Sequence, residues 1–226
     1  MAIATTEENS SGSAALNTLF GVVAIAAILS SVLGPDWHWL HYVSKPLATA
    51  LLLVLVWRIL LPISTRYKWA ILTGLVFALC GDVFLMLPQD HFVAGLICFL
   101  ITHCFYIIAL TSDARFGAKP LTFVACIVVA SCMVWGLWAS LAPDLKLPVA
   151  AYALVLGLMA AQAISRAQFL STRSARLAAI GAVLFMISDG IVAYGKFRFD
   201  IPLQGLWVLT TYFAAQWFVA KSVAHT

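Results

Sequence analysis

Two aspartates stand inside long apolar runs and are the residues best suited to chemistry. Asp82 lies in the run 78–87 and Asp189 in the run 181–190, and each is the only acid of its run. A charged side chain at the centre of a bilayer costs at least about 2.5–3.5 kcal/mol on insertion scales, so such residues usually have a function. Two carboxyl groups, one protonated and one ionised, can act as a general acid and a general base. The pair therefore predicts acid–base chemistry inside a membrane.

Six further polar side chains are candidates for the same site. At a helical rise of 1.5 Å per residue, both aspartates lie about 10 Å below one surface of a hydrocarbon core about 30 Å thick. The same reasoning brings Lys45 and Tyr212 to that depth from two other apolar runs. The other candidates lie nearer the middle of the bilayer or nearer its surface: His103, Tyr106, Gln216 and Tyr152.

These residues also have structural interpretations. Lys45 either pairs with one acid across the helix bundle or binds a phosphate group, for which lysine is well suited. One lysine cannot balance two acids, so one carboxyl group is expected to be protonated or to share a proton with its neighbour. An interior hydrogen-bonded position suits His103 as well as a catalytic role does, and the tyrosines are equally well interpreted as packing aromatics. The sequence shows no set of metal ligands, and His38 and His41 are interpreted as interface residues.

The elements that position these side chains are predicted to be membrane-spanning helices. Of 226 residues, 63% are hydrophobic and only 10% are charged, whereas soluble domains have roughly 25% charged residues. The sequence therefore predicts an all-α polytopic membrane protein with a polar N-terminal tail at residues 1–15 and a single transmembrane domain at residues 16–222. Runs of about 20 apolar residues predict eight transmembrane helices: 16–33, 38–61, 69–88, 91–110, 119–141, 148–165, 175–194 and 203–222.

The lysines and arginines indicate how the chain crosses the membrane. Most of them fall on the side that holds both termini, and the opposite side has only Lys146, Lys196 and Arg198. The positive-inside rule therefore predicts a multi-pass protein with both termini in the cytoplasm, in a bacterial inner membrane or an endomembrane. Aligning the two aspartates at an offset of about 107 residues also pairs Lys45 with Tyr152, which indicates a parallel repeat of four plus four helices.

Two signatures around the aspartates, each with a smaller motif before it, follow one another between residues 45 and 220. The first reads Gly81-Asp82-x-x-Leu85, then Phe92-x-x-Gly95-Leu96-x-x-Phe99-x-x-x-His103-x-x-Tyr106. The second reads Gly181-x-x-Leu184-Phe185-x-x-Ser188-Asp189, then Thr211-Tyr212-x-x-x-Gln216. The smaller motifs are Lys45-Pro46 and Leu147-Pro148-x-x-x-Tyr152. In this order and spacing, the motifs resemble the YhhN-like lysoplasmalogenase family.

The resemblance implies an eight-span membrane hydrolase that cleaves the vinyl ether bond of lysoplasmalogens. The products would be a fatty aldehyde and glycerophosphocholine or glycerophosphoethanolamine. Asp82 and Asp189 would be catalytic, and the substrate would contact Lys45, His103, Tyr106, Tyr152, Tyr212 and Gln216. The chemistry suits two carboxyl groups, because a vinyl ether hydrolyses through an oxocarbenium ion, as in paired-acid glycoside hydrolysis. This reaction requires no metal or nucleotide, and no cofactor is expected.

The expected partners are a lysoplasmalogen substrate and membrane lipid, without nucleic acid, and the sequence predicts no particular oligomeric state. A small proton-coupled transporter is the alternative from another class, because intramembrane acids and repeated helices also suit a carrier. A lipid-binding membrane protein without catalytic activity is a third interpretation. The position of the acids favours the enzyme over the carrier, because they lie nearer one surface than the midplane.

Overall fold

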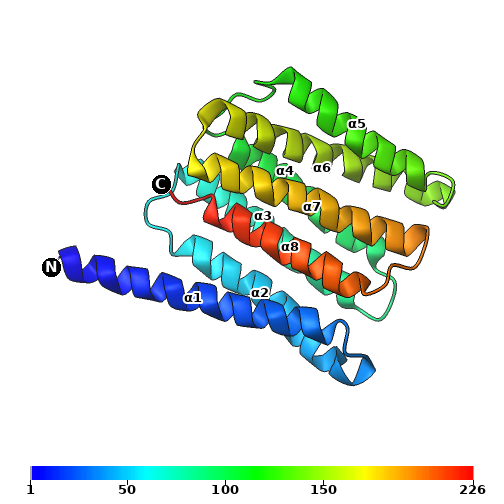
Figure 1. Ribbon diagram of the computed structural model, residues 1–226, viewed down its shortest axis with the longest axis horizontal. Helices are drawn as coiled ribbons and strands as arrows, with labels where there is room; N and C mark the ends of the chain where they lie inside the picture. Colours follow the sequence, from blue (N-terminus) through cyan, green and yellow to red (C-terminus); the bar gives the residue numbers. More distant parts are fainter. Residues whose placement is uncertain (1, 226) are drawn as a thin grey trace.

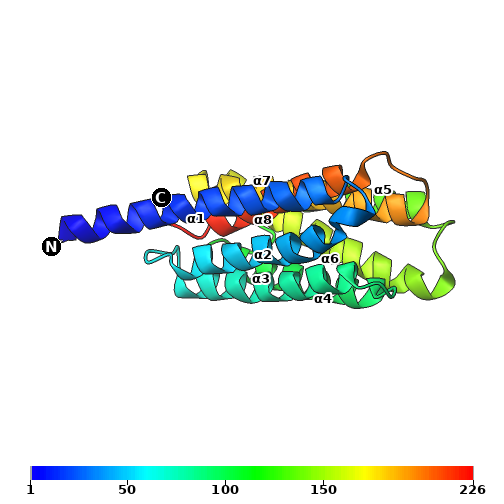
Figure 2. The same ribbon diagram turned by 90° about the horizontal axis from the view of Figure 1, so that it is seen from below.

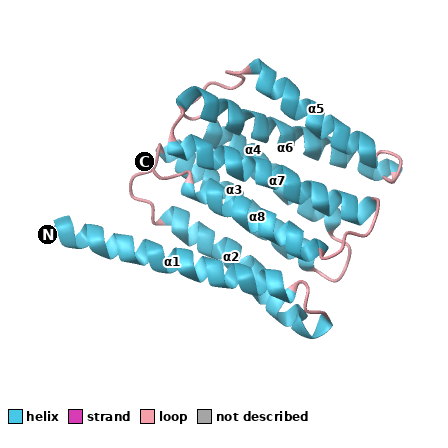
Figure 3. Cartoon of the chain, in the orientation of Figure 1, coloured by secondary structure: helices cyan, strands magenta, loops and turns pink. Residues whose placement is uncertain are grey.

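The computed structural model describes residues 2–225 of the chain, and the side chains from Gly12 onward. Within that range the chain forms α-helices joined by short loops, with no strand (Figure 3). The helices are α1 (Ala2–Ser30), α2 (His38–Trp57), α3 (Thr65–Met86), α4 (Phe92–Leu110), α5 (Pro120–Leu137), α6 (Pro143–Leu170), α7 (Arg173–Phe197) and α8 (Gln204–Lys221), with a 3-10 turn at Pro35–Trp37.

The helices run nearly parallel or antiparallel to one another and form two layers. Figure 2 shows α1, α7 and α8 in one layer and α2, α3 and α4 in the other. Helix α6 contacts both α4 and α7, and α5 packs mainly on α6. Helices α1 and α5 lie at opposite edges of the bundle, and both ends of the chain lie at the same end of it (Figure 1).

The two helices that carry the aspartates begin at side-chain caps. The hydroxyl of Ser64 accepts a hydrogen bond from the backbone N–H of Tyr67 at 3.0 Å, which starts α3. Thr172 does the same for the N–H of Ala175 at 3.2 Å, which starts α7. Such caps satisfy N–H groups that the first helical turn leaves without partners. They fix the start of each helix and therefore the level at which its aspartate lies.

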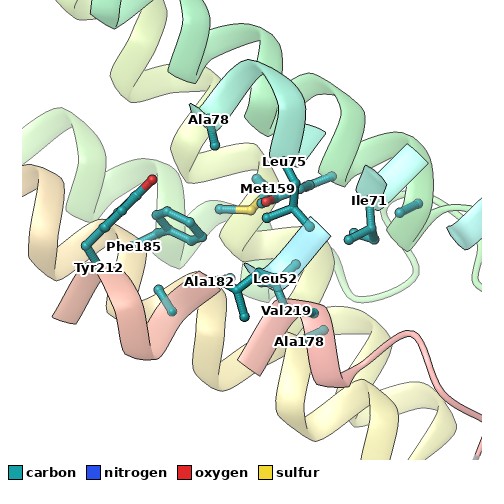
Figure 4. Close-up of a cluster of buried hydrophobic side chains, with 14 of the residues drawn as sticks. Leu52, Ile71, Leu75, Ala78, Met159, Ala178, Ala182, Phe185, Tyr212 and Val219 are labelled. Carbon is teal, nitrogen blue, oxygen red and sulfur yellow. The ribbon is translucent and has the colours of Figure 1, made fainter. Parts of the chain in front are cut away.

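An apolar cluster fills the middle of the bundle, between the polar groups around the aspartates and a second set of buried polar side chains near the end of α8, including Arg166, Ser174 and Ser222. Figure 4 shows Leu75, Met159 and Phe185 packed together with Tyr212, whose hydroxyl lies at the edge of this cluster. The rings of Phe185 and Tyr212 meet edge to face, with centroids 5.9 Å apart. This packing holds the Tyr212 ring in one orientation, so its hydroxyl has a fixed position.

The structure confirms the all-helical, membrane-spanning class. In the described part of the chain, seven helices are long and apolar enough to cross a membrane, from the Gly12–Ser30 part of α1 to α7. Helix α8 is not among them; its polar residues Tyr212 and Gln216 are buried inside the bundle. The count of eight spans, the four-plus-four repeat and the cytoplasmic termini stay predictions. Helix α1 begins at Ala2, so the segment expected as a polar tail is helical.

Candidate active site

Asp82 is held by side chains from two other helices. Helix α2 supplies Lys45, whose Nζ lies 3.4 Å from Oδ1, and Thr49, whose hydroxyl donates to Oδ2 at 2.7 Å. Helix α8 supplies Tyr212, whose hydroxyl also donates to Oδ2 at 2.7 Å. The Asp82 side chain is only 1% exposed. A lysine and two hydroxyl donors around one buried carboxyl group favour its ionised form.

A chain of hydrogen bonds behind Tyr212 fixes the direction in which it donates. The Gln216 amide N–H donates to the Tyr212 hydroxyl oxygen at 3.1 Å. The Tyr106 hydroxyl in turn donates to the Gln216 amide oxygen at 2.7 Å. Because Tyr212 accepts from Gln216, its own proton is directed at Asp82. Gln216 and Tyr106 therefore connect to the Asp82 carboxylate only through Tyr212.

Asp189 has a different set of neighbours. The Tyr152 hydroxyl on α6 donates to Asp189 Oδ2 at 2.5 Å. Among the described residues, no lysine, arginine or histidine forms an ion pair with Asp189. Its side chain is only partly buried because it faces a cavity. One carboxyl group thus has a cation beside it, and the other has a neutral phenol.

Both carboxyl groups face one cavity with a volume of about 110 Å³. Lys45, Tyr152 and Tyr212 also line it, and the rest of the wall is mostly apolar, including Phe99 and Leu156. The structure therefore brings five of the eight candidate residues to one space: Lys45, Asp82, Tyr152, Asp189 and Tyr212. A small, mostly apolar cavity with a few convergent polar groups is the usual form of a small-molecule site.

His103 lies behind this cavity and does not line it. Its ring is fully buried and packs edge to face against Tyr152 and Phe185, with centroids 5.4 and 5.3 Å away. Within the described part of the chain, neither ring nitrogen has a hydrogen-bond partner. The placement of His103 suits support of the Tyr152 ring. Substrate contacts by His103, Tyr106 and Gln216 stay predictions.

Two residues beside the aspartates were not among the site residues predicted from the sequence. Thr49 donates to Asp82, and its position four residues after Lys45 on the same helix face was the available signal. Ser188 lines the cavity beside Asp189, with its hydroxyl donating to the Val208 carbonyl at 3.1 Å. Within residues 12–225, no group of three histidine, cysteine or acidic side chains lies close enough together to hold a metal ion.

The bundle end nearer the aspartates carries an exposed ion pair between the α3–α4 loop and α7. The Lys196 Nζ lies 3.3 Å from Asp90 Oδ2. The pKa of Asp90 lies below its ordinary value, first because the backbone N–H of Phe92 donates to it and then because Lys196 is beside it. Phe92 and Phe197, the neighbours of this pair, line the cavity. The pair therefore lies close to the cavity wall but outside it.

Residues 40–223 match the model of the YhhN family. The chain belongs to this family. Among similar proteins, Lysoplasmalogenase TMEM86A from Homo sapiens is 35% identical over 174 residues, which cover 73% of this chain and 68% of that protein. The TMEM86A protein from Bos taurus is 32% identical over 172 residues, with the same coverage.

A bacterial relative covers more of the chain at lower identity. The Escherichia coli O157:H7 protein named "Uncharacterized membrane protein YhhN" is 26% identical over 210 residues, which cover 90% of this chain and 97% of that protein. No solved structure matches the chain. The match to the YhhN family model begins at residue 40. Lys45, both aspartates, Tyr152 and Tyr212 therefore fall within the family region, whereas α1 lies outside it.

Proposed function

We propose that this protein is a membrane hydrolase that cleaves the vinyl ether bond of lysoplasmalogens. One observation carries the proposal: two carboxyl groups with unlike partners face a single, mostly apolar cavity. The relatives named lysoplasmalogenases support the substrate class. The products are a fatty aldehyde and a glycerophosphodiester of choline or ethanolamine.

The partners of the two aspartates support a division of roles. Asp82 has Lys45 at 3.4 Å and two hydroxyl donors, so it is the ionised group. Among the described residues, Asp189 accepts a hydrogen bond only from the Tyr152 hydroxyl and has no cation beside it, so in a mostly apolar cavity it is the protonated group. Asp189 is therefore the general acid, and Asp82 is the carboxylate that stabilises positive charge.

The reaction follows from these two states. Asp189 gives its proton to the β-carbon of the vinyl ether, which leaves an oxocarbenium ion opposite the Asp82 carboxylate. Water adds to the cationic carbon and returns a proton to Asp189, which forms a hemiacetal. The hemiacetal C–O bond to glycerol then breaks, and the hydroxyl proton moves to the departing oxygen. The result is one aldehyde and one alcohol for each water consumed, with Asp189 protonated again.

The remaining cavity residues are assigned to binding. Lys45 lines the cavity and is suited to a phosphate group as well as to Asp82. Tyr152 and Tyr212 hold the two carboxyl groups in place and face the same space, where they contact the glycerol or the water. His103 supports Tyr152 from behind, and Tyr106 and Gln216 set the direction of the Tyr212 proton.

We further propose that all eight helices, including α8, cross the membrane and that both termini face the cytoplasm. Both ends of the chain lie at one end of the bundle, as an even number of crossings requires (Figure 1). Most of the lysines and arginines fall on the side that holds both termini, and the positive-inside rule therefore puts that side in the cytoplasm. The aspartates would then lie in the non-cytoplasmic half of the bilayer. Labelling of single cysteines introduced at the α3–α4 and α6–α7 loops, with a membrane-impermeant reagent, tests this orientation.

The activity is tested with purified protein and two lipids of equal chain length. One is a lysoplasmalogen, and the other is its saturated alkyl-ether analogue, which cannot form the oxocarbenium ion by protonation. Aldehyde release from the vinyl ether alone is expected. Absence of aldehyde, together with proton flux in liposomes, would refute the hydrolase and favour the transporter.

The roles of the two acids are tested by Asp82→Asn and Asp189→Asn, with Asp90→Asn as the matched control. Each of the first two variants is expected to lose aldehyde release while still inserting and folding. Asp90 is an exposed loop residue at the same end of the bundle, so its variant keeps the activity. Full activity in either cavity variant would remove that acid from the mechanism.

A further inference from the structure

A second apolar space opens beside the cavity, between α5 and α7. Because α5 packs mainly on α6 and touches α7 at few points, a groove of about 510 Å³ remains between them. Val129 on α5 and Ile187 on α7 line this groove and are 51% and 45% exposed. In a membrane-spanning bundle, such exposed apolar side chains face lipid. The groove therefore opens sideways into the bilayer.

The groove and the cavity share a wall. Met133, Met186 and Gly190 line both spaces. Gly190 follows Asp189 directly, and a β-carbon at this position would overlap the terminal methyl of Met133. The absence of a side chain at Gly190 thus lets the end of Met133 lie on the backbone of α7. The partition between the two spaces is the flexible end of an unbranched side chain, next to the proposed general acid.

The two adjoining spaces match the two parts of the proposed substrate, one polar and one hydrocarbon. In a lysoplasmalogen, the vinyl ether bond joins the hydrocarbon chain to the polar glycerophosphate part. An enzyme that cleaves this bond must hold a polar group on one side of its acid and a hydrocarbon chain on the other. Lys45 and Asp82 line the cavity, whereas the groove contributes only apolar side chains apart from Tyr194. The Tyr194 hydroxyl donates to the Met133 carbonyl at 3.3 Å, so it is not free for a ligand.

We propose that the groove between α5 and α7 binds the hydrocarbon chain of the substrate, which enters sideways from the bilayer past Met133 and Met186. This inference rests on the proposed function and adds a chain-binding site and an entry route to it. Methionine suits a movable partition, because its side chain rotates freely and adapts to different apolar shapes. The groove then determines which chain lengths are cleaved efficiently.

Two neighbouring valines on α5 provide a matched pair of variants. Val129 lines the groove, whereas Val128 is equally exposed to lipid but lies outside it. Val129→Trp is expected to fill the groove and to lower kcat/KM for long-chain lysoplasmalogens by roughly tenfold, because each excluded methylene loses its apolar contact. Activity toward a short-chain lysoplasmalogen is expected to change less than twofold. Val128→Trp is expected to leave both activities unchanged. An equal loss for all chain lengths, or the same effect of both variants, would overturn the inference.

A second measurement tests, without catalysis, whether the groove binds the hydrocarbon chain. A non-hydrolysable alkyl-ether lysolipid with a diazirine at the end of its chain is crosslinked to the wild-type protein. Labelling is expected on the groove residues Cys126, Ile164 and Val183, and an excess of unlabelled alkyl-ether lysolipid is expected to suppress it. Labelling elsewhere, or equal labelling by a diacyl phospholipid probe, would show that the groove holds only bulk lipid and would overturn the inference. If wild-type protein releases no aldehyde at any chain length, the proposed function fails, while the crosslink still decides whether the groove binds the chain.

Discussion

Replacing Lys45 by methionine tests whether Asp82 is the ionised member of the pair. The Asp82 side chain is 1% exposed, and Lys45, at 3.4 Å, is its only cationic neighbour in the described part of the chain. In Lys45→Met, the carboxyl group must either stay buried as an unbalanced charge or take up a proton. Breaking a buried pair by removing one partner typically costs about 3–5 kcal/mol.

Uptake of a proton by Asp82 gives a second, independent value for the loss of unfolding free energy. A carboxyl group with the ordinary acidity of aspartic acid costs about 4 kcal/mol to protonate at pH 7, at about 1.4 kcal/mol per pH unit. The two figures agree, so Lys45→Met is expected to lower the free energy of unfolding by about 4 kcal/mol at pH 7. Because the folded variant then binds one proton more than the unfolded chain, its deficit shrinks as the pH falls, to about 1.5 kcal/mol at pH 5.

The assay is unfolding in mixed micelles of detergent and sodium dodecyl sulfate at pH 7 and pH 5. The double variant Lys45→Met with Asp82→Asn removes the charge as well, so it is expected to recover most of the stability and to lose the pH dependence. Lys196→Met breaks an exposed ion pair and serves as the control, with little change expected at either pH. A Lys45→Met protein as stable as the wild type at pH 7 would show that Asp82 is already neutral, and the assignment of Asp82 as the ionised carboxylate would fail.

Three further predictions follow from contacts elsewhere in the bundle. Arg166→Met is expected to cost about 2–4 kcal/mol of unfolding free energy, because this buried guanidinium pairs with a partly exposed aspartate in the loop after α4. KM should be unchanged, since Arg166 lies about 15 Å along α6 from Leu156, the nearest residue of that helix on the cavity wall. Gly181→Ala should lower the unfolding midpoint, because a β-carbon there would lie 2.8 Å from the Ala215 carbonyl oxygen of α8; a midpoint equal to the wild type would contradict this. Tyr152→Lys gives Asp189 a cation, so aldehyde release should fall at least tenfold while the protein stays folded, and retained release would contradict the role of Asp189 as acid.

The class of fold and the shared site of the polar residues were accessible from the sequence for a simple geometric reason. A helix advances by a fixed distance per residue, so positions in spanning segments translate into depths. This reasoning predicted a common depth for Lys45, Asp82 and Tyr212, which are in contact in the structure. Depth does not say which way a side chain points around the helix. For His103 the sequence therefore left the ring's direction open; the ring lies behind Tyr152, and its contact with substrate stays a prediction.

The partner of each acid could not be predicted, because partners depend on which helices adjoin. The sequence shows one lysine and two acids at similar depth, which leaves open which acid the lysine balances. Only the packing of α2 against α3 places Lys45 and Thr49 on Asp82, and only the packing of α6 against α7 places Tyr152 on Asp189. Lateral neighbours in a bundle are set by packing and hydrogen bonds between helices, and these join residues that are far apart in the chain.

The proposed repeat gives this difference a structural basis. An offset of about 107 residues places Tyr152 where Lys45 stands, and Asp189 where Asp82 stands. In both halves, the residue on the earlier helix contacts the acid on the next one, as an ion pair in the first half and as a phenol hydrogen bond in the second. Under the proposed repeat, two equivalent positions hold a cation and a neutral donor. Together with the hydroxyl donors Thr49 and Tyr212 on Asp82, this difference favours an ionised Asp82 and a protonated Asp189. Under the proposal, the asymmetry needed for acid–base hydrolysis arises from what stands opposite each aspartate, and not from the aspartates themselves.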